Sequence, residues 1–275
     1  MKSVIKKIAS TAVILLLVLA ATPLFAGGEA EESASAPEEK VVTTVLQEKI
    51  DTFDVFVSAL AEPLKVLGMV CETLVVYDEN LQVQPLLAES WSVSEDQLTW
   101  SFKLKEGINF HDGTPLNAEN LTAYMWNHMF EKSFNAWEFA VIDEMVATGE
   151  YTFDFKLSEP YPMLINYLAD PWNIIESAGT REELGDRYGF EGLVGTGPFM
   201  FEEWVRGDHV TLVKNPDYNH GPGYLSNQGP ANVDKIIFRI IPEPITRVTE
   251  LQYGNVDYLQ KIPANMIEKV QEDED

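Results

Sequence analysis

The sequence predicts a mixed α/β fold, of the α+β kind rather than one built from strictly alternating strand–helix units. Residues 98–104 and 151–157 alternate apolar and polar side chains, which is typical of strands with one buried face. Other segments repeat apolar residues at helical spacing, and they lie between the strands in no strict order. The 275 residues are 45% hydrophobic and 11% aromatic, so the chain has enough apolar side chains for a sizeable core.

Six segments are predicted to be strands. The segment VVTTVL at 41–46 is short and β-branched, which favours a strand at the start of the folded part. The segment IIFRII at 236–241 is almost continuously apolar, as in a strand that is covered on both faces. The other predicted strands are residues 98–104, 151–157, 210–213 and 256–259.

Six segments are predicted to be helices. Pro63 favours a helix start, and the spacing of apolar residues after it predicts a helix over 64–74. A helix over 244–253 is predicted to begin at Pro244 and to end before Gly254. The other predicted helices are residues 118–130, 162–170 and 181–188, and one that begins near Pro263.

The first 26 residues are predicted to be a secretory signal. Lys2, Lys6 and Lys7 form a basic start, and the apolar run ILLLVL that follows is too short to span a bilayer comfortably. The alternative is an uncleaved N-terminal anchor, which is disfavoured because Pro23 interrupts the end of the run. We therefore expect the protein to be exported, to the periplasm or to the extracellular side of the cell envelope.

Residues 27–40 are acidic, rich in small residues and without aromatics, so a flexible acidic linker is predicted between the signal and a folded part at 41–275. Cys71 is the single cysteine, which excludes an internal disulfide, and its apolar surroundings predict burial. The net charge of −25 would repel nucleic acid and anionic lipid, so we expect no nucleic-acid partner.

The stretch FHDGTPLNAENL at 110–121 poses a choice between a reactive cluster and a turn that leads into a helix. Asp112 and Gly113 are turn residues, and Asn117 stands where a helix N-cap is expected. A metal site or a general base would need partners, yet the other histidines lack ligand spacing and no HExxH motif occurs. The turn with a cap is therefore favoured, and no metal or organic cofactor is predicted.

The segment LAESWSVSEDQLTWSFKLKEGINFHDGTPLNAENL at 87–121 resembles the signature region of the extracellular solute-binding proteins of peptide and nickel ABC importers. A second block has the same order as in that family: GTGPF at 195–199, KNPDY at 214–218 and LQYGNVDYL at 251–259. The resemblance extends from about residue 41 to the end of the chain. Small departures, such as Asn117 at the cap, do not touch ligand binding.

This resemblance implies a periplasmic binding protein-like fold, in which two lobes joined by a hinge close over a ligand. Members of the family are usually much longer, so residues 41–275 are expected to be mainly the N-terminal lobe, cut before the second lobe. In the peptide binders several partners of the ligand termini lie in that second lobe. The chain alone therefore does not reveal whether the ligand is a peptide, nickel, a sugar or another solute.

The resemblance also implies that the segment after the first strand, DTFDVFVSALAEP at 51–63, runs along the ligand cleft. An extended ligand would pair there with backbone groups, and phenylalanines would form apolar walls, although burial in the core is an equal alternative for both aromatic residues. Trp172 and Asn173 follow Pro171 and are further candidates, with packing as the alternative. The candidate ligand-binding residues are Asp51, Phe53, Asp54, Val55, Phe56, Ser58, Trp172 and Asn173.

Three functions are compatible with the sequence. The favoured one is the substrate-binding component of an ABC importer, a monomer and not an enzyme, which captures a peptide or similar small solute and delivers it to a membrane permease. The second is a secreted hydrolase with paired carboxylates, but the 44 acidic residues are scattered and no GxSxG nucleophile motif occurs. The third is a truncated paralogue with a sensory role.

Overall fold

The structure is a computed structural model, and it describes residues 39–271. The predicted signal at 1–26 and all but the last two residues of the predicted linker lie outside the described residues. The strands are β1 (Val41–Leu46), β2 (Val75–Tyr77), β3 (Val83–Pro85), β4 (Ala88–Val93), β5 (Thr99–Leu104), β6 (Ile142–Gly149), β7 (Thr152–Leu157), β8 (Phe199–Val205), β9 (His209–Lys214) and β10 (Lys235–Ile240). The α-helices are α1 (Leu64–Val70), α2 (Ala118–Tyr124), α3 (Phe130–Lys132), α4 (Leu164–Tyr167), α5 (Ala178–Leu184), α6 (Pro244–Gln252) and α7 (Ile267–Gln271).

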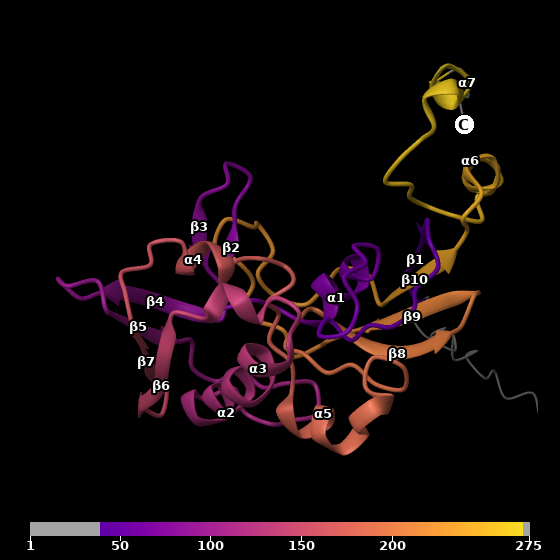
Figure 1. Cartoon of the computed structure of the whole chain (residues 1–275). Helices are drawn as coiled ribbons and strands as arrows, with labels where there is room; N and C mark the ends of the chain where they lie inside the picture. The colour runs from indigo at the N-terminus through magenta and orange to yellow at the C-terminus, as the bar shows by residue number, and fades with distance from the viewer. Residues whose placement is uncertain (1–38, 272–275) are drawn as a thin grey trace, which may run out of the picture. The chain divides into compact units, whose positions relative to one another are not determined.

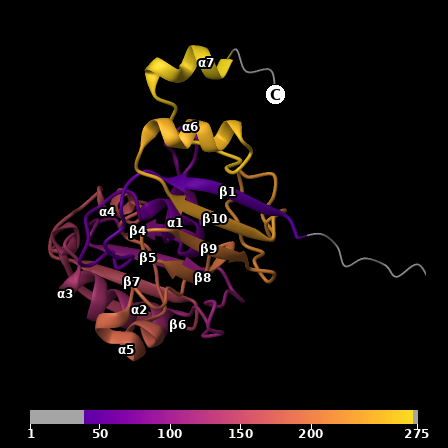
Figure 2. The same ribbon diagram turned by 90° about the vertical axis from the view of Figure 1, so that its right-hand side faces the viewer.

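The described strands form two four-stranded sheets and one hairpin, so the predicted mixed α/β class is confirmed. One sheet has the order β1-β10-β9-β8, in which β1 and β10 are parallel and the other neighbours antiparallel. The second has the antiparallel order β4-β5-β7-β6, and β2 and β3 form the hairpin. Figure 1 shows the two groups of strands, and Figure 2 shows α6 along β1 and β10.

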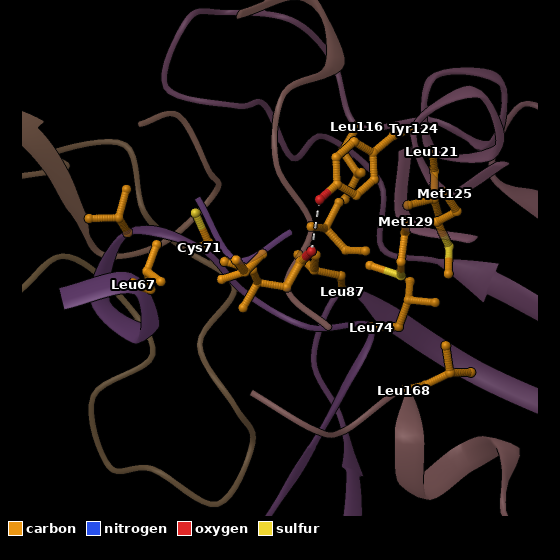
Figure 3. Packing of buried hydrophobic residues seen from close by; sticks show 14 of the residues in the cluster. Leu67, Cys71, Leu74, Leu87, Leu116, Leu121, Tyr124, Met125, Met129 and Leu168 are labelled. Carbon is orange, nitrogen blue, oxygen red and sulfur yellow. Dashed lines mark hydrogen bonds between the residues drawn. The ribbon is translucent and has the colours of Figure 1, made fainter. Parts of the chain in front are cut away.

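The sheet β4-β5-β7-β6 confirms the two alternating segments of the sequence. Trp100, Phe102 and Leu104 of β5 are buried, and the polar residues between them lie on the other face. Phe102 lies opposite Phe153 of β7, and their rings stack with centroids 5.2 Å apart. Helix α2 packs on β6 and β7, so this sheet and this helix share the main core. Figure 3 shows part of that core, with Leu121 and Tyr124 of α2 among the labelled residues.

The helix predicted over 118–130 forms, but it is not a regular α-helix throughout. Asn117 caps it as predicted, because its side-chain oxygen accepts a hydrogen bond from the Asn120 N–H at 2.8 Å. After Tyr124 the backbone makes a π-helical turn over Met125–Met129. His128 and Met129 are both buried, as are Leu121, Tyr124 and Met125, so the same face of the helix continues into the core through the π-helical turn.

Four element predictions were wrong in extent or type. The helix predicted over 181–188 begins earlier, at Ala178, and is α-helical only to Leu184, with a 3-10 turn over Gly185–Arg187. The helix predicted over 64–74 ends at Val70, because Cys71 adopts an extended conformation and the chain continues into β2. Of the helix predicted over 162–170 only α4 is α-helical. Residues 256–259 were predicted to be a strand but form none, although the Asp257 N–H donates to the Thr43 carbonyl at 2.8 Å and the Asp257 carboxylate accepts from the Thr43 N–H at 2.7 Å.

Candidate functional site

The segment 51–63 follows β1 and lies mainly against the core. Phe53 is buried, with its ring 5.0 Å from that of Trp204, and its N–H donates to the Gly189 carbonyl at 3.0 Å. Val55 and Phe56 are also buried. These three side chains therefore hold the segment against the core. A direct contact between them and a ligand stays a prediction.

Asp54 connects this segment to helix α5. Its two carboxylate oxygens each accept a hydrogen bond from the Arg181 guanidinium at 3.0 Å. The same carboxylate accepts from the Phe56 N–H at 2.9 Å, and the Asp54 carbonyl accepts from the N–H groups of Val57 and Ser58. Asp54 thus fixes the turn at 54–58, and Arg181 fixes Asp54.

Arg181 has two aromatic and two carboxylate partners. Its guanidinium carbon lies 4.0 Å from the centre of the Phe56 ring and 4.1 Å from that of the Tyr188 ring. It also donates to the fully buried carboxylate of Glu176 at 2.5 Å. Burial alone would lower the pKa of Arg181, but Glu176 and the other surrounding partners outweigh it and raise the pKa above its ordinary value, so the residue stays charged.

The tip of the segment, at 57–61, differs from its buried start. Ser58 is buried and donates to the Asp51 carboxylate at 2.9 Å, whereas Val57, Ala59, Leu60 and Ala61 are exposed. Within residues 39–271 no group accepts a hydrogen bond from the backbone N–H of Ala59 or Ala61. The loop that Asp54 and Arg181 fix in place therefore exposes two backbone N–H groups, those of Ala59 and Ala61, that can donate hydrogen bonds to a ligand or to water.

Trp172 belongs to a larger group of aromatic side chains that the sequence reading did not identify. Its ring meets that of Phe134 edge to face at 5.4 Å, and Trp137, whose residue is 65% exposed, meets Tyr167 at 5.9 Å. Tyr161 stacks on Tyr167 at 5.9 Å. These ring contacts form two sets, Phe134 with Trp172 and Trp137 with Tyr161 and Tyr167. We refer to the five residues together as the aromatic surface.

Asn173, the other candidate in this region, supports the aromatic surface from inside. It is buried, and its amide donates to the Glu138 carboxylate at 2.7 Å and to the Tyr167 carbonyl at 2.9 Å.

Burial, together with a hydrogen bond to Tyr167, raises the pKa of Tyr161 to about 12, so its hydroxyl is neutral at physiological pH. The side chains of the aromatic surface are uncharged there and suit apolar or ring-shaped groups.

The residues around His111 have structural roles. The His111 side chain is 2.9 Å from the Gly197 carbonyl through Nε2, and the Asp112 carboxylate accepts hydrogen bonds from the hydroxyls of Ser177 and Thr180. Among the described residues no group of three or more potential metal ligands comes together. The predicted turn followed by a capped helix is confirmed at this position.

Two glycines of the GTGPF segment are required by close packing. A Cβ at Gly195 would lie 2.2 Å from the Val70 carbonyl oxygen, and one at Gly197 would lie 2.6 Å from the Met69 carbonyl oxygen. Thr196 between them donates to the buried Glu72 carboxylate at 2.8 Å. This segment therefore packs closely against the C-terminal end of α1, and its role is to hold the fold together.

Part of the chain matches proteins of known type. The family model of bacterial extracellular solute-binding proteins, family 5 (middle), matches residues 82–275. The chain is 31% identical over 198 residues to a probable D,D-dipeptide-binding periplasmic protein of Escherichia coli K12, with 70% of this chain and 37% of that protein covered. It is 32% identical over 201 residues to the glutathione-binding protein of the same strain, with the same coverage.

Solved structures agree with these relatives. A binding protein of A. tumefaciens R10 in complex with agropinic acid superposes with a TM-score of 0.74 at 28% identity, over 84% of this chain and 45% of that chain. A nickel ABC transporter protein of Bacillus halodurans gives a TM-score of 0.73 at 27% identity, over 86% of this chain and 46% of that chain. The chain thus spans less than half of the length of each of these four relatives. In the part of the chain that the structure describes, no helix is long and apolar enough to cross a membrane.

Proposed function

The chain belongs to the bacterial extracellular solute-binding proteins, family 5, and on this premise we propose that it serves an ABC importer as the substrate-binding component. It captures a peptide or similar small solute between two lobes and delivers it to a membrane permease. The relatives support a binding role, since their names state a dipeptide and glutathione as ligands. Structural matches that cover 45% and 46% of the matched chains support the assignment of residues 41–275 to one lobe.

In this proposal residues 1–26 are a signal for export, residues 27–40 are a linker, and the protein works as a monomer in the periplasm or at the outer side of the envelope. Ligand contacts from two lobes stabilise a closed form, and the permease recognises that form. No turnover of the solute is involved.

The observation that carries the proposal is the clamped loop after β1. The bidentate pair of Asp54 and Arg181 fixes the loop, and its tip leaves the N–H groups of Ala59 and Ala61 unpaired among the described residues. Such a rigid edge fits an extended ligand that pairs through its own backbone, whatever its side chains. Asp51, Phe53, Asp54, Val55, Phe56 and Ser58 belong to this loop and act mainly by holding its tip in place.

The aromatic surface is the second part of the proposed site. Trp137 is exposed although an indole ring is usually well buried, and Trp172 and Phe134 of the same surface contact each other edge to face. Trp172 would contact the ligand directly, while Asn173 holds the segment that carries it. This surface would take the apolar or ring-shaped part of a solute.

Mass spectrometry of the complete gene product tests the proposal. The protein is purified under native conditions and denatured, and the released small molecules are identified. We expect a stoichiometric amount of unmodified solute, as a ladder of short peptides or a single compound. A protein that releases no solute would contradict capture, and one that converts added peptides into smaller products would favour the hydrolase. A gene beside a membrane kinase instead of permease genes would favour the sensory paralogue.

A further inference from the structure

A cavity is lined in part by residues that adjoin the aromatic surface along the chain, namely Ala169, Pro171 and Ile174. It encloses about 410 Å³ between helix α1, the β2–β3 hairpin, residues 169–174 and the loop at 218–225. We call it the Gly68 pocket. Gly68 lines it together with mainly apolar residues, among them Cys71, Val76, Leu86, Ile174 and Leu225.

The polar groups of the Gly68 pocket are already satisfied. Glu72 lines the pocket, but its carboxylate accepts hydrogen bonds from the hydroxyls of Thr196 and Tyr218, at 2.8 and 2.7 Å, and its other close partner is the His220 ring at 2.8 Å. Burial raises the pKa of the Cys71 thiol, which therefore stays uncharged. An occupant consequently finds no free cation among the residues that line the pocket, and the Glu72 side chain, which already accepts hydrogen bonds, offers no donor to an anion.

Gly68 itself is the feature that packing does not explain. It lies inside α1, and a glycine within a helix makes that helix less stable than an alanine would. A Cβ at this position would meet no atom within 4 Å, whereas one at Gly195 would lie 2.2 Å from a carbonyl oxygen. Gly68 is exposed at the edge of the pocket, so a side chain at this position would enter open space there without disturbing the fold.

The outer wall of the pocket is a loop rich in glycine and proline. Tyr224 and Leu225 stand on it and are only about half buried, with 44% and 46% exposure. The Tyr224 hydroxyl donates to the Tyr77 carbonyl at 3.2 Å, which joins this loop to the hairpin. Tyr77 in turn accepts a hydrogen bond from the Asn166 amide of α4 at 2.9 Å, next to Tyr167 of the aromatic surface.

We propose that the Gly68 pocket holds a bulky uncharged apolar group of the bound solute, either an aromatic ring or a branched aliphatic chain. Pro171 and Ile174 line the pocket, and Trp172 between them belongs to the aromatic surface, so the two regions are continuous along the chain. The volume lies in the range of ordinary ligand pockets. The proposal rests on the proposed function, because it names the chemical class of the solute that this lobe selects.

Indole is a suitable probe, because it is neutral, apolar and small enough for the pocket. It is titrated into the complete gene product with ¹³C-labelled methyl groups on Val, Leu and Ile, and methyl NMR spectra are recorded. We expect saturable shifts of the signals from Val76, Leu86, Ile174 and Leu225. In Gly68→Phe the phenyl group fills the pocket, so these shifts should disappear, whereas Gly68→Ala should keep them.

Unchanged methyl signals outside the pocket show that Gly68→Phe is folded. Wild-type protein without saturable shifts, or Gly68→Phe with the same shifts as wild type, would overturn the proposal. The solutes that co-purify with the three proteins are then compared by mass spectrometry. We expect Gly68→Phe to lose those with bulky apolar groups, and retention of the same solutes would also overturn the proposal. If no protein carries a solute, the proposed transport function fails, and the indole titration still decides whether the pocket binds an apolar group.

Discussion

Asp54 and Arg181, 127 positions apart in the chain, form a bidentate ion pair with two hydrogen bonds of 3.0 Å. The pair joins the loop after β1 to helix α5, and the buried Glu176 carboxylate binds the same guanidinium. Planar two-point contacts of this kind fix orientation as well as distance. The loop that we assign to ligand binding is therefore positioned by a helix from a distant part of the sequence.

Replacement of Arg181 by Met should lower the free energy of unfolding by about 3–5 kcal/mol, because it leaves the carboxylates of Glu176 and Asp54 without their cation. Urea denaturation followed by circular dichroism measures the change. Arg187→Met is the matched control, since Arg187 pairs with Glu191 and both side chains are 57% exposed. The control should change stability by less than about 1 kcal/mol. Equal effects of the two variants would show that the buried pair does not stabilise the loop.

Trp137→Ala should weaken binding of the solute identified by mass spectrometry at least about tenfold, or about 1.4 kcal/mol, because an exposed aromatic anchor is removed from the aromatic surface. Stability should change little, since Trp137 is mostly exposed. Calorimetric titration of the complete gene product measures the affinity. Trp126→Ala is the control, because Trp126 is also partly exposed but lies outside the aromatic surface. An equal loss of affinity in both variants would remove the aromatic surface from the proposed site.

Gly195→Ala should destabilise the fold by about 1–3 kcal/mol or more, because the new methyl group would overlap the Val70 carbonyl oxygen and the Cys71 sulfur. Gly68→Ala should instead be neutral or stabilise by up to about 1 kcal/mol, since its Cβ enters open space in a helix. The midpoints of urea unfolding compare the two variants. A stable Gly195→Ala protein would mean that the GTGPF segment tolerates a side chain and does not define the fold as described.

His209 should make stability depend on pH. Hydrogen bonds to Asp208 and to Glu203 raise the pKa of His209 above its ordinary value of 6.5, against the opposing effect of burial. A raised folded-state pKa means that the stabilisation is fully present below pH 6.5 and is lost as the pH rises through the folded-state pKa. The pKa of an unfolded histidine is about 6.5. His209→Gln should therefore be less stable than wild type at pH 5.5, and about as stable as wild type at pH 8.5. A stability difference that grows toward high pH would contradict this assignment.

The elements that sequence analysis predicted well are those with a strong periodic pattern. In β5 and β7 every second residue is buried, so the alternation is visible in the sequence. The edge strands β4 and β6 were missed, because most of their residues are exposed or half-buried and no alternation results. The π-helical turn after Tyr124 was missed as well, since apolar spacing there also fits a regular helix.

The proposed site was predicted only in part, for a related reason. The loop at 51–63 and Trp172 were identified, but the partner of Asp54 lies in α5 and no local pattern connects the two. The aromatic surface combines residues from two segments, 134–137 and 161–172, which only the tertiary fold brings together. The aromatic residues of the FNAWEF stretch at 134–139 were the one feature of the sequence that could have indicated this surface. Aromatic side chains are usually buried, however, so the stretch alone does not distinguish a binding surface from a core.

The parallel pairing of β1 with β10 has a consequence for how the protein folds. The two strands are joined in register from Val41 opposite Lys235 to Leu46 opposite Ile240, so nearly two hundred intervening residues form one closed loop. Closing such a loop costs chain entropy before any contact between the strands compensates for it, and non-local pairings of this kind fold slowly. We expect β1 to gain protection from hydrogen exchange last during refolding, after the β4-β5-β7-β6 sheet, whose neighbouring strands are closer in sequence. During synthesis β1 would therefore stay without its partner strand until the chain has been made as far as residue 240.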